Sequence, residues 1–273
     1  MFNDNNQDIG TELLKSAAET VIQNSLGKPT KTIGDILDSC LFLAFGGLKH
    51  RADLRRAKYA AALEEFEREI KLETAAIPEE QRIEPNTRTL MTALQDAQFC
   101  AEEEEIRQMF ARLIASTMNA ASSNNVHPSF SGILKTMHPN EAKLLAVIHH
   151  NIRVPVSDIS IHSDRGELVI FRHICILDPI NDNPITQTSI AVDGLSRHGL
   201  IRIDQDCRAD QEEYQPIEDT PEMKALRKQL HMPPEERLPS LRDATGVVVY
   251  GYAAQLTQLG INFCSVCLPA RGK

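Results

Sequence analysis

The chain has 273 residues, of which 42% are hydrophobic and 25% are charged, a composition typical of one or two globular domains. Its formal net charge of −9 repels nucleic acid and anionic membrane surfaces at long range, so binding to either requires a local basic patch. The first ten residues are polar and acidic and lack the pattern of a signal peptide, so we expect a cytoplasmic protein.

Apolar residues at helical spacing predict helices over residues 11–23, 33–48, 52–74 and 87–98. The most apolar run, residues 36–48, is too short for a spanning helix, which needs about 20 residues. We interpret it as a buried core helix. Two alternatives stay open. One is an interfacial helix, peripheral to the inner membrane, in which Leu41, Phe42 and Phe45 contact the membrane or a partner. The other is a hinge at Gly46 and Gly47.

The clearest amphipathic pattern predicts a helix over residues 102–121. Its first turn holds four consecutive glutamates, residues 102–105, which the helix dipole favours at that position. We therefore interpret these carboxylates as structural groups rather than metal ligands. The apolar stripe of this helix includes Met109, Phe110 and Leu113.

Two histidine-proline pairs, His127-Pro128 and His138-Pro139, each precede a short predicted helix. Proline suits the first position of a helix because the amide hydrogen it lacks would have no partner there. We expect both histidines to cap or pack, with a catalytic role as the minor alternative. Phe130 begins the apolar stripe of the first of these helices.

After residue 151 the pattern becomes β-rich. Strands are predicted over residues 152–161, 167–176, 200–203, 247–250 and 261–268, and a helix over residues 186–198. Residues 206–240 form an acidic, proline-rich segment with a predicted helix at 221–230, which we interpret as a mobile or surface insertion.

The predicted fold class is α+β and mostly α. A helical bundle over residues 1–137 precedes a winged-helix-like domain over residues 138–273 that carries the insertion 206–240. Residues 186–198 would take the recognition position, and residues 200–203 and 261–268 would be the wing strands.

DNA binding by such a domain requires clustered cations. Residues 138–204 hold six Lys/Arg and eight Asp/Glu. Arg197, opposed by Asp193, and Arg202 are therefore candidate contacts for a protein partner, with nucleic acid less favoured.

Motifs of the common catalytic sites are absent from the sequence, which has no Gly-x-Ser-x-Gly elbow, no His-Glu-x-x-His and no complete phosphate loop. The pair Cys264 and Cys267 lacks a second pair at metal-ligand spacing, so we interpret it as two buried thiols, with structural zinc as the alternative. We expect no catalytic residue, no cofactor and no metal.

Six short sequence segments, taken in this order, resemble one bacterial family. They are IPEEQRIEP (77–85), EIRQMFARLIAS (105–116), VHPSFSGIL (126–134), NEAKLL (140–145), LSRHGLI (195–201) and LTQLGINFC (256–264). Over residues 54–267 the chain resembles the abortive-infection alpha family. The resemblance implies a bacterial protein that defends against phage by halting or killing the infected cell, and it supplies no catalytic residues. Its motif positions, expected to be structural, are Met109, Phe110, Leu113, His127, Pro128, Phe130, Glu141, Leu195, Gly199, Leu256, Gly260 and Phe263.

The leading hypothesis is a non-enzymatic anti-phage protein that acts by binding a phage or host protein, with membrane perturbation as a variant. A membrane surface and a second copy of the chain remain alternative partners. A winged-helix transcriptional regulator and an enzyme with an unrecognised active site are the competing hypotheses.

Overall fold

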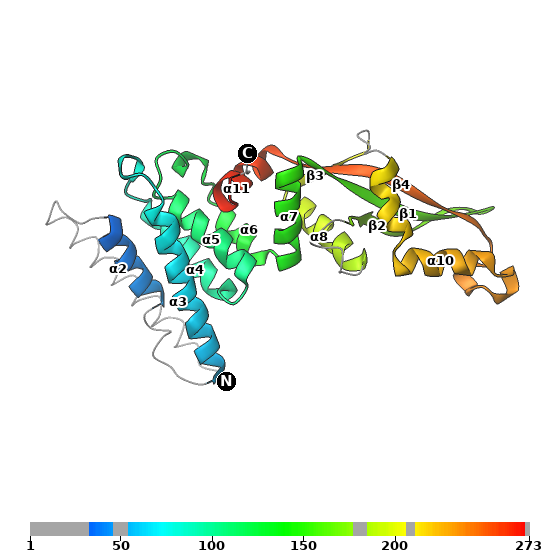
Figure 1. Cartoon of the computed structure of the whole chain (residues 1–273), viewed down its shortest axis with the longest axis horizontal. Helices are drawn as coiled ribbons and strands as arrows, with labels where there is room; N and C mark the ends of the chain where they lie inside the picture. The colour runs from blue at the N-terminus through cyan, green and yellow to red at the C-terminus, as the bar shows by residue number, and fades with distance from the viewer. Residues whose placement is uncertain (1–32, 46–53, 177–184, 206–210, 271–273) are drawn as a thin grey trace, which may run out of the picture. The chain divides into compact units, whose positions relative to one another are not determined.

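The computed structural model describes residues 33–45, 54–176, 185–205 and 211–270 (Figure 1). The chain divides into two compact units, Met1–Lys135 and Thr136–Lys273. The helix expected over residues 11–23 and the hinge expected at Gly46 and Gly47 lie outside the described residues.

The described part of the first unit is helical (Figure 1). Each helix expected between residues 33 and 121 is confirmed, although α5 ends at Ser116, earlier than expected. The α-helices are α2 (Ile33–Phe45), α3 (Leu54–Ala75), α4 (Thr87–Ala97), α5 (Glu104–Ser116) and α6 (Phe130–Thr136). Single 3-10 turns lie between them at η1 (Glu79–Gln81), η2 (Gln98–Cys100) and η3 (Ser123–Asn125).

Helix α2 is part of the core of this unit. Leu41 and Phe45 are buried, and the Phe45 ring packs edge-on against Phe66 at a centroid distance of 5.7 Å. Gln98 Nε2 donates a hydrogen bond to Ala44 O at 2.7 Å, which ties the last turn of α2 to the end of α4. No helix in the described ranges has the length and apolar content needed to cross a bilayer.

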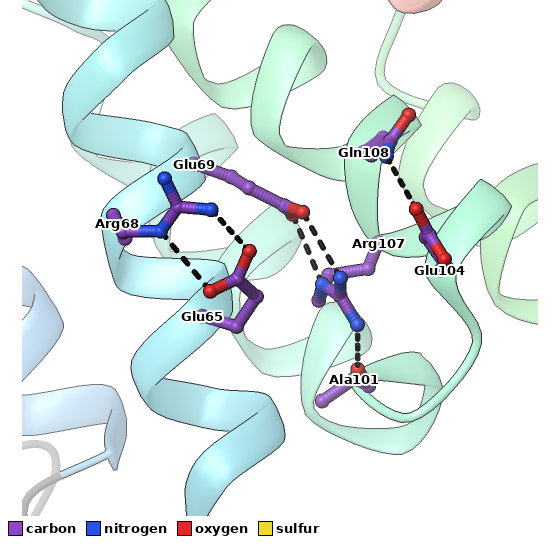
Figure 2. Close-up of polar contacts among 7 residues, drawn as sticks. All are labelled: Glu65, Arg68, Glu69, Ala101, Glu104, Arg107 and Gln108. Carbon is purple, nitrogen blue, oxygen red and sulfur yellow. Dashed lines mark hydrogen bonds and ion pairs between the residues drawn. The ribbon is translucent and has the colours of Figure 1, made fainter.

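A partly buried ion pair joins α3 to α5 (Figure 2). Arg107 Nε and Nη2 donate to the two carboxylate oxygens of Glu69, each at 3.0 Å, and Arg107 Nη1 donates to Ala101 O at 3.1 Å. The two charged side chains are 11% and 13% exposed. This bidentate geometry fixes the facing sides of the two helices relative to each other.

The second unit contains a four-stranded antiparallel sheet with strand order β2-β1-β4-β3. Its strands are β1 (Arg153–Ser163), β2 (Gly166–Ile174), β3 (Ile201–Asp204) and β4 (Ala244–Leu256). The strands expected over residues 152–161, 167–176, 200–203 and 247–250 are confirmed. β4 is longer than expected and pairs along the whole of β1.

The helices of the second unit precede, separate and follow these strands in the sequence. They are α7 (Pro139–Asn151), α8 (Ile185–Arg197), α9 (Gln215–Glu218), α10 (Pro221–His231) and α11 (Gln258–Cys267), with 3-10 turns at η4 (Gln211–Tyr214), η5 (Pro234–Glu236) and η6 (Pro239–Leu241). The expected cap of α7 is confirmed. His138 Nδ1 accepts from Asn140 N–H, and Glu141 Oε2 accepts from His138 N–H, which forms a capping box.

The prediction of a wing strand over residues 261–268 is wrong, because these residues belong mainly to helix α11. The hydroxyl of Thr257 caps the helix by accepting from Gly260 N–H at 3.0 Å. Buried Gly260, Phe263, Cys264 and Cys267 recur at helical spacing, whereas Ile261 is 47% exposed. A short apolar run does not by itself distinguish a strand from a buried helix, and the cap is the decisive signal.

The interpretation of residues 206–240 as a mobile or surface insertion also needs correction for its described part. Ile217, Met223 and Leu226 are buried in one hydrophobic cluster with Ile159 and Ile161 of β1. The amphipathic helix α10 supplies two of these residues. The segment is acidic outside and apolar where it meets the sheet, so it completes the core of the second unit.

Candidate functional site

The first unit contains a groove of about 330 Å³ between α4, α5 and the segment that precedes α6. We name it the His127 groove, because this motif residue lines it together with the motif residues Leu113 and Pro128. Its lining residues are Asn86, Arg88, Thr89, Thr92, Ala93, Leu113, Val126, His127, Pro128 and Ser131.

The amino-terminal end of α4 forms one side of the His127 groove. Asn86 is the N-cap, and its side-chain oxygen accepts from Thr89 N–H at 3.1 Å. The helix dipole places partial positive charge at this end. Arg88, an exposed residue of the first turn, adds a full positive charge beside it.

His127 forms the opposite side. Its Nδ1 accepts from Ser129 N–H at 3.2 Å and lies 2.7 Å from Ser129 Oγ. Because a backbone N–H can only donate, Nδ1 must hold a lone pair, and the ring hydrogen is on Nε2. The ring also packs against the buried Phe130, with the centroids 5.8 Å apart. His127 therefore presents a fixed Nε2–H donor.

Pro128 lies in a turn rather than at the first helical position, since α6 begins at Phe130. This differs from the expected helix start. The cause is a local hydrogen bond, which Ser129 N–H donates to Nδ1 of His127.

Hydroxyl groups complete the polar lining. Thr92 Oγ1 donates to Arg88 O at 2.9 Å, which leaves its lone pairs able to accept a hydrogen bond. Ser131 is 6% exposed, and its hydroxyl makes no hydrogen bond within the described part of the chain. Arg88 has no carboxylate partner there. No lining residue is acidic, so the groove offers donors and positive charge to a small acceptor.

Sequence reasoning singled out Leu113, His127 and Pro128 but missed Arg88, Thr89, Thr92 and Ser131. The proline before Asn86 and the Asn86-x-x-Thr89 spacing are signals of a capped helix start. Nothing in the local pattern shows that this start lies beside residues 126–131.

The other motif residues of the first unit, Met109, Phe110 and Phe130, are buried core side chains.

In the second unit Glu141 is buried at the contact between α7 and α8. A Cβ atom added to Gly194 would lie 1.6 Å from Glu141 Oε1, so a side chain at this position requires the Glu141 carboxylate to move. His198 Nε2 lies 3.9 Å from Glu141 Oε2. Burial lowers the pKa of His198 below its ordinary value, and Arg197 adds to this, while Glu141 acts in the opposite direction.

The remaining motif residues shape the contact between β3, β4 and α11. Leu195 and Phe263 are fully buried, and Leu256 pairs with Ile201 across the sheet. Gly199 has φ +70°, a conformation that favours glycine. Gly260 approaches the backbone of Leu200 so closely that a Cβ atom would lie 1.9 Å from its carbonyl oxygen.

The two arginines of the predicted recognition region lie on different elements. Arg197 ends α8, and its Nη2 donates to His198 Nε2 at 3.2 Å. Arg202 is exposed on β3, opposite Gln255. Asp193 does not oppose Arg197 by an ion pair. Its carboxylate lies 2.5 Å from Nδ1 of His173.

These features define a mostly helical α+β protein with a curled four-stranded antiparallel sheet and a donor-lined groove. The family described as Abortive infection alpha matches residues 58–267, and the chain belongs to this family.

Comparison with solved structures finds similarity to the structure of the uncharacterized protein from the hydrocarbon-degrading marine bacterium Alcanivorax borkumensis SK2. That protein is 14% identical to this chain, with a TM-score of 0.34, and the match covers 54% of this chain and 94% of that one. A comparison with curated proteins finds no match.

Proposed function

We propose that this protein protects bacteria against phage by abortive infection, and that it does so by binding a protein partner rather than by catalysis. The observation that carries the proposal is the family match, which extends over residues 58–267 and so includes parts of both units. Abortive infection requires that the protein change state when a phage enters the cell. A protein that binds a phage or host protein meets this requirement without chemistry of its own.

The use of the buried acids supports binding rather than catalysis. Glu141 is occupied by the capping box of α7. Asp158, another buried acid, accepts from His173 N–H at 2.8 Å and lies 3.7 Å from Arg172 Nη1. Both carboxylates therefore hold backbone and neighbouring side chains in place, which is a structural use.

The second unit is the proposed binding module. If β2 and the helices α9 and α10 between β3 and β4 are treated as additions, the remaining order α7, β1, α8, β3, β4 supports a winged-helix-like interpretation in which α8 occupies the recognition position. The helical first unit would be the bundle that accompanies it. Ile190, on α8, is 67% exposed. An exposed aliphatic side chain on this helix fits a protein surface better than a phosphate backbone.

Phage plating tests the proposal directly. Cells that carry the gene should give fewer plaques than cells without it, for at least one phage of a broad panel. The variant Ile190→Ser should lose protection while its circular dichroism and melting temperature match those of the wild type. The matched control is Leu238→Ser, which changes another exposed leucine-sized side chain of the second unit and should retain protection.

Equal plating with and without the gene across the panel would count against the defence function. Retained protection by Ile190→Ser would count against α8 as the binding surface. The regulator alternative is tested separately, since salt-dependent binding to duplex DNA that Arg197→Gln and Arg202→Gln weaken would favour it.

The membrane variant of the proposal rests on Phe42, which is 74% exposed on α2. Leu41 and Phe45, the other two candidate contacts, are buried, so they would meet a lipid surface after α2 leaves its site in the first unit. Leakage of dye from vesicles containing anionic lipid, and its loss in Phe42→Asp, would support this variant and a peripheral location at the inner membrane.

A further inference from the structure

We infer that the His127 groove binds a small organic phosphate, with the phosphate at the amino-terminal end of α4 and the organic part against the apolar wall. This ligand site goes beyond the proposed function, which assigns no role to the first unit's groove.

Charge and hydrogen-bond polarity select an anion. The groove is lined by the first turn of α4, which carries the positive end of the helix dipole, by Arg88, which has no carboxylate partner in the described part of the chain, and by the imidazole of His127. Helix ends and arginine forks are the two features that proteins combine to hold phosphate. The lack of any acidic lining residue means that nothing in the groove repels a dianion.

Ser131 is a second and independent observation. A hydroxyl that has no partner within the protein can both donate and accept a hydrogen bond to a bound molecule. Ser131 is 6% exposed and lines the groove, yet its hydroxyl makes no hydrogen bond among the described residues. A phosphate oxygen or a hydroxyl of a bound ligand would satisfy it. Ser131 thus offers the groove a hydroxyl that no residue in the described part of the chain already uses.

The size and the apolar lining restrict the ligand further. A volume of about 330 Å³ is near the lower limit for pockets that bind organic molecules. Ala93, Leu113, Val126 and Pro128 provide a wall without polar side chains. The groove therefore accommodates a phosphate together with a small apolar or aromatic group. A mononucleotide, which joins a phosphate to an aromatic base through a ribose, is a ligand of this class.

The experiment is calorimetric titration of the full-length protein with inorganic phosphate, adenosine 5′-monophosphate and adenosine. We expect saturable binding of the nucleotide, weaker binding of phosphate in competition with it, and adenosine binding weaker by roughly tenfold or more, since the charge-assisted hydrogen bonds are lost. Arg88→Gln should weaken nucleotide binding by a similar factor. The matched control is Arg68→Gln, which removes an exposed arginine of α3 outside the groove and should leave binding unchanged.

Ser131→Ala separates a ligand contact from a structural role. In the free protein the variant should melt close to the wild-type temperature, because the hydroxyl makes no hydrogen bond among the described residues. With the nucleotide present, the ligand-induced rise in melting temperature should shrink. A lower melting temperature of the free variant would show that the hydroxyl has a structural partner and would overturn this step.

Absence of saturable binding by both phosphate and the nucleotide would overturn the inference. So would binding that Arg88→Gln and Ser131→Ala leave unchanged, since the ligand would then sit elsewhere. Ligand binding is measured on the purified protein, whereas the defence function is measured by phage plating. A negative result in one experiment therefore leaves the other conclusion untouched.

Discussion

Replacement of Arg107 by methionine should destabilise the first unit, because it leaves a partly buried carboxylate without the cation that binds both of its oxygens. Arg107 donates two hydrogen bonds to Glu69 and one to Ala101 O (Figure 2). Breaking a buried ion pair by removing one partner costs roughly 3–5 kcal/mol. The side chains are 11% and 13% exposed, so water reaches the remaining carboxylate slightly and we expect a cost at the lower limit, about 3 kcal/mol.

For a protein of roughly this size, each kcal/mol shifts the melting temperature by about 2–4 °C, so Arg107→Met should lower it by about 6–12 °C. Thermal unfolding of the full-length protein, followed by circular dichroism and calorimetry, measures this shift. The double variant Glu69→Met, Arg107→Met removes both charges. It should melt above the single variant, because no uncompensated charge remains.

The matched control is Arg68→Met, which breaks the pair of Arg68 with Glu65 one turn away on the exposed face of α3. Its melting temperature should stay close to that of the wild type, because exposed pairs contribute little. The reasoning is refuted if Arg107→Met melts no lower than Arg68→Met. It is also refuted if the double variant melts below Arg107→Met, since the uncompensated charge would then not be the cause.

Three further changes test other parts of the fold. Gly260→Ala would bring a Cβ atom to 1.9 Å from a backbone carbonyl oxygen, so it should cost at least about 1–3 kcal/mol in urea unfolding, whereas Gly246→Ala, which has open space, should not. Phe45→Asp should prevent the first unit from folding, by circular dichroism, because the ring is fully buried, whereas Phe42→Asp should fold normally. The pKa of His198 is lowered by burial, so below about pH 6.5 the unfolded chain binds a proton that the folded chain resists. Stability should therefore fall as the pH drops through this range, and the variant His198→Gln should show a smaller fall. A pH dependence equal to that of the wild type would contradict this.

Periodic patterns predicted most elements because they depend on neighbours in the sequence. The stripe through Met109, Phe110 and Leu113 predicted α5, and the histidine-proline pair before Glu141 predicted the capped start of α7. Two differences between prediction and structure in the second unit have another origin. Apolarity alone makes residues 261–268 resemble a strand, although the cap at Thr257 begins a helix there. The acids of the segment 206–240 are typical of a surface insertion, although its described part has a buried face.

The His127 groove could be predicted only in part. The motif pointed to His127, whose Nδ1 contact with Ser129 is local. Arg88 and Ser131 are more than 40 residues apart in the sequence, and packing of α4 against α5 and α6 brings them to one space. Sequence periodicity reports which residues of one element share a face, but not which elements pack together. The residues that line the groove therefore could not be predicted as a group.

The contact between Glu141 and Gly194 has a consequence for how the family can diverge. The carboxylate occupies the volume where any side chain at position 194 would begin, so a larger residue there requires the Glu141 side chain to move or to be shorter. Relatives with alanine or a larger residue at the position of Gly194 should carry a shorter residue in place of Glu141. They would then lose the carboxylate that closes the capping box at His138. Relatives that replace this glycine and keep the glutamate should therefore be rare, whereas a shorter residue at position 141 alone creates no clash.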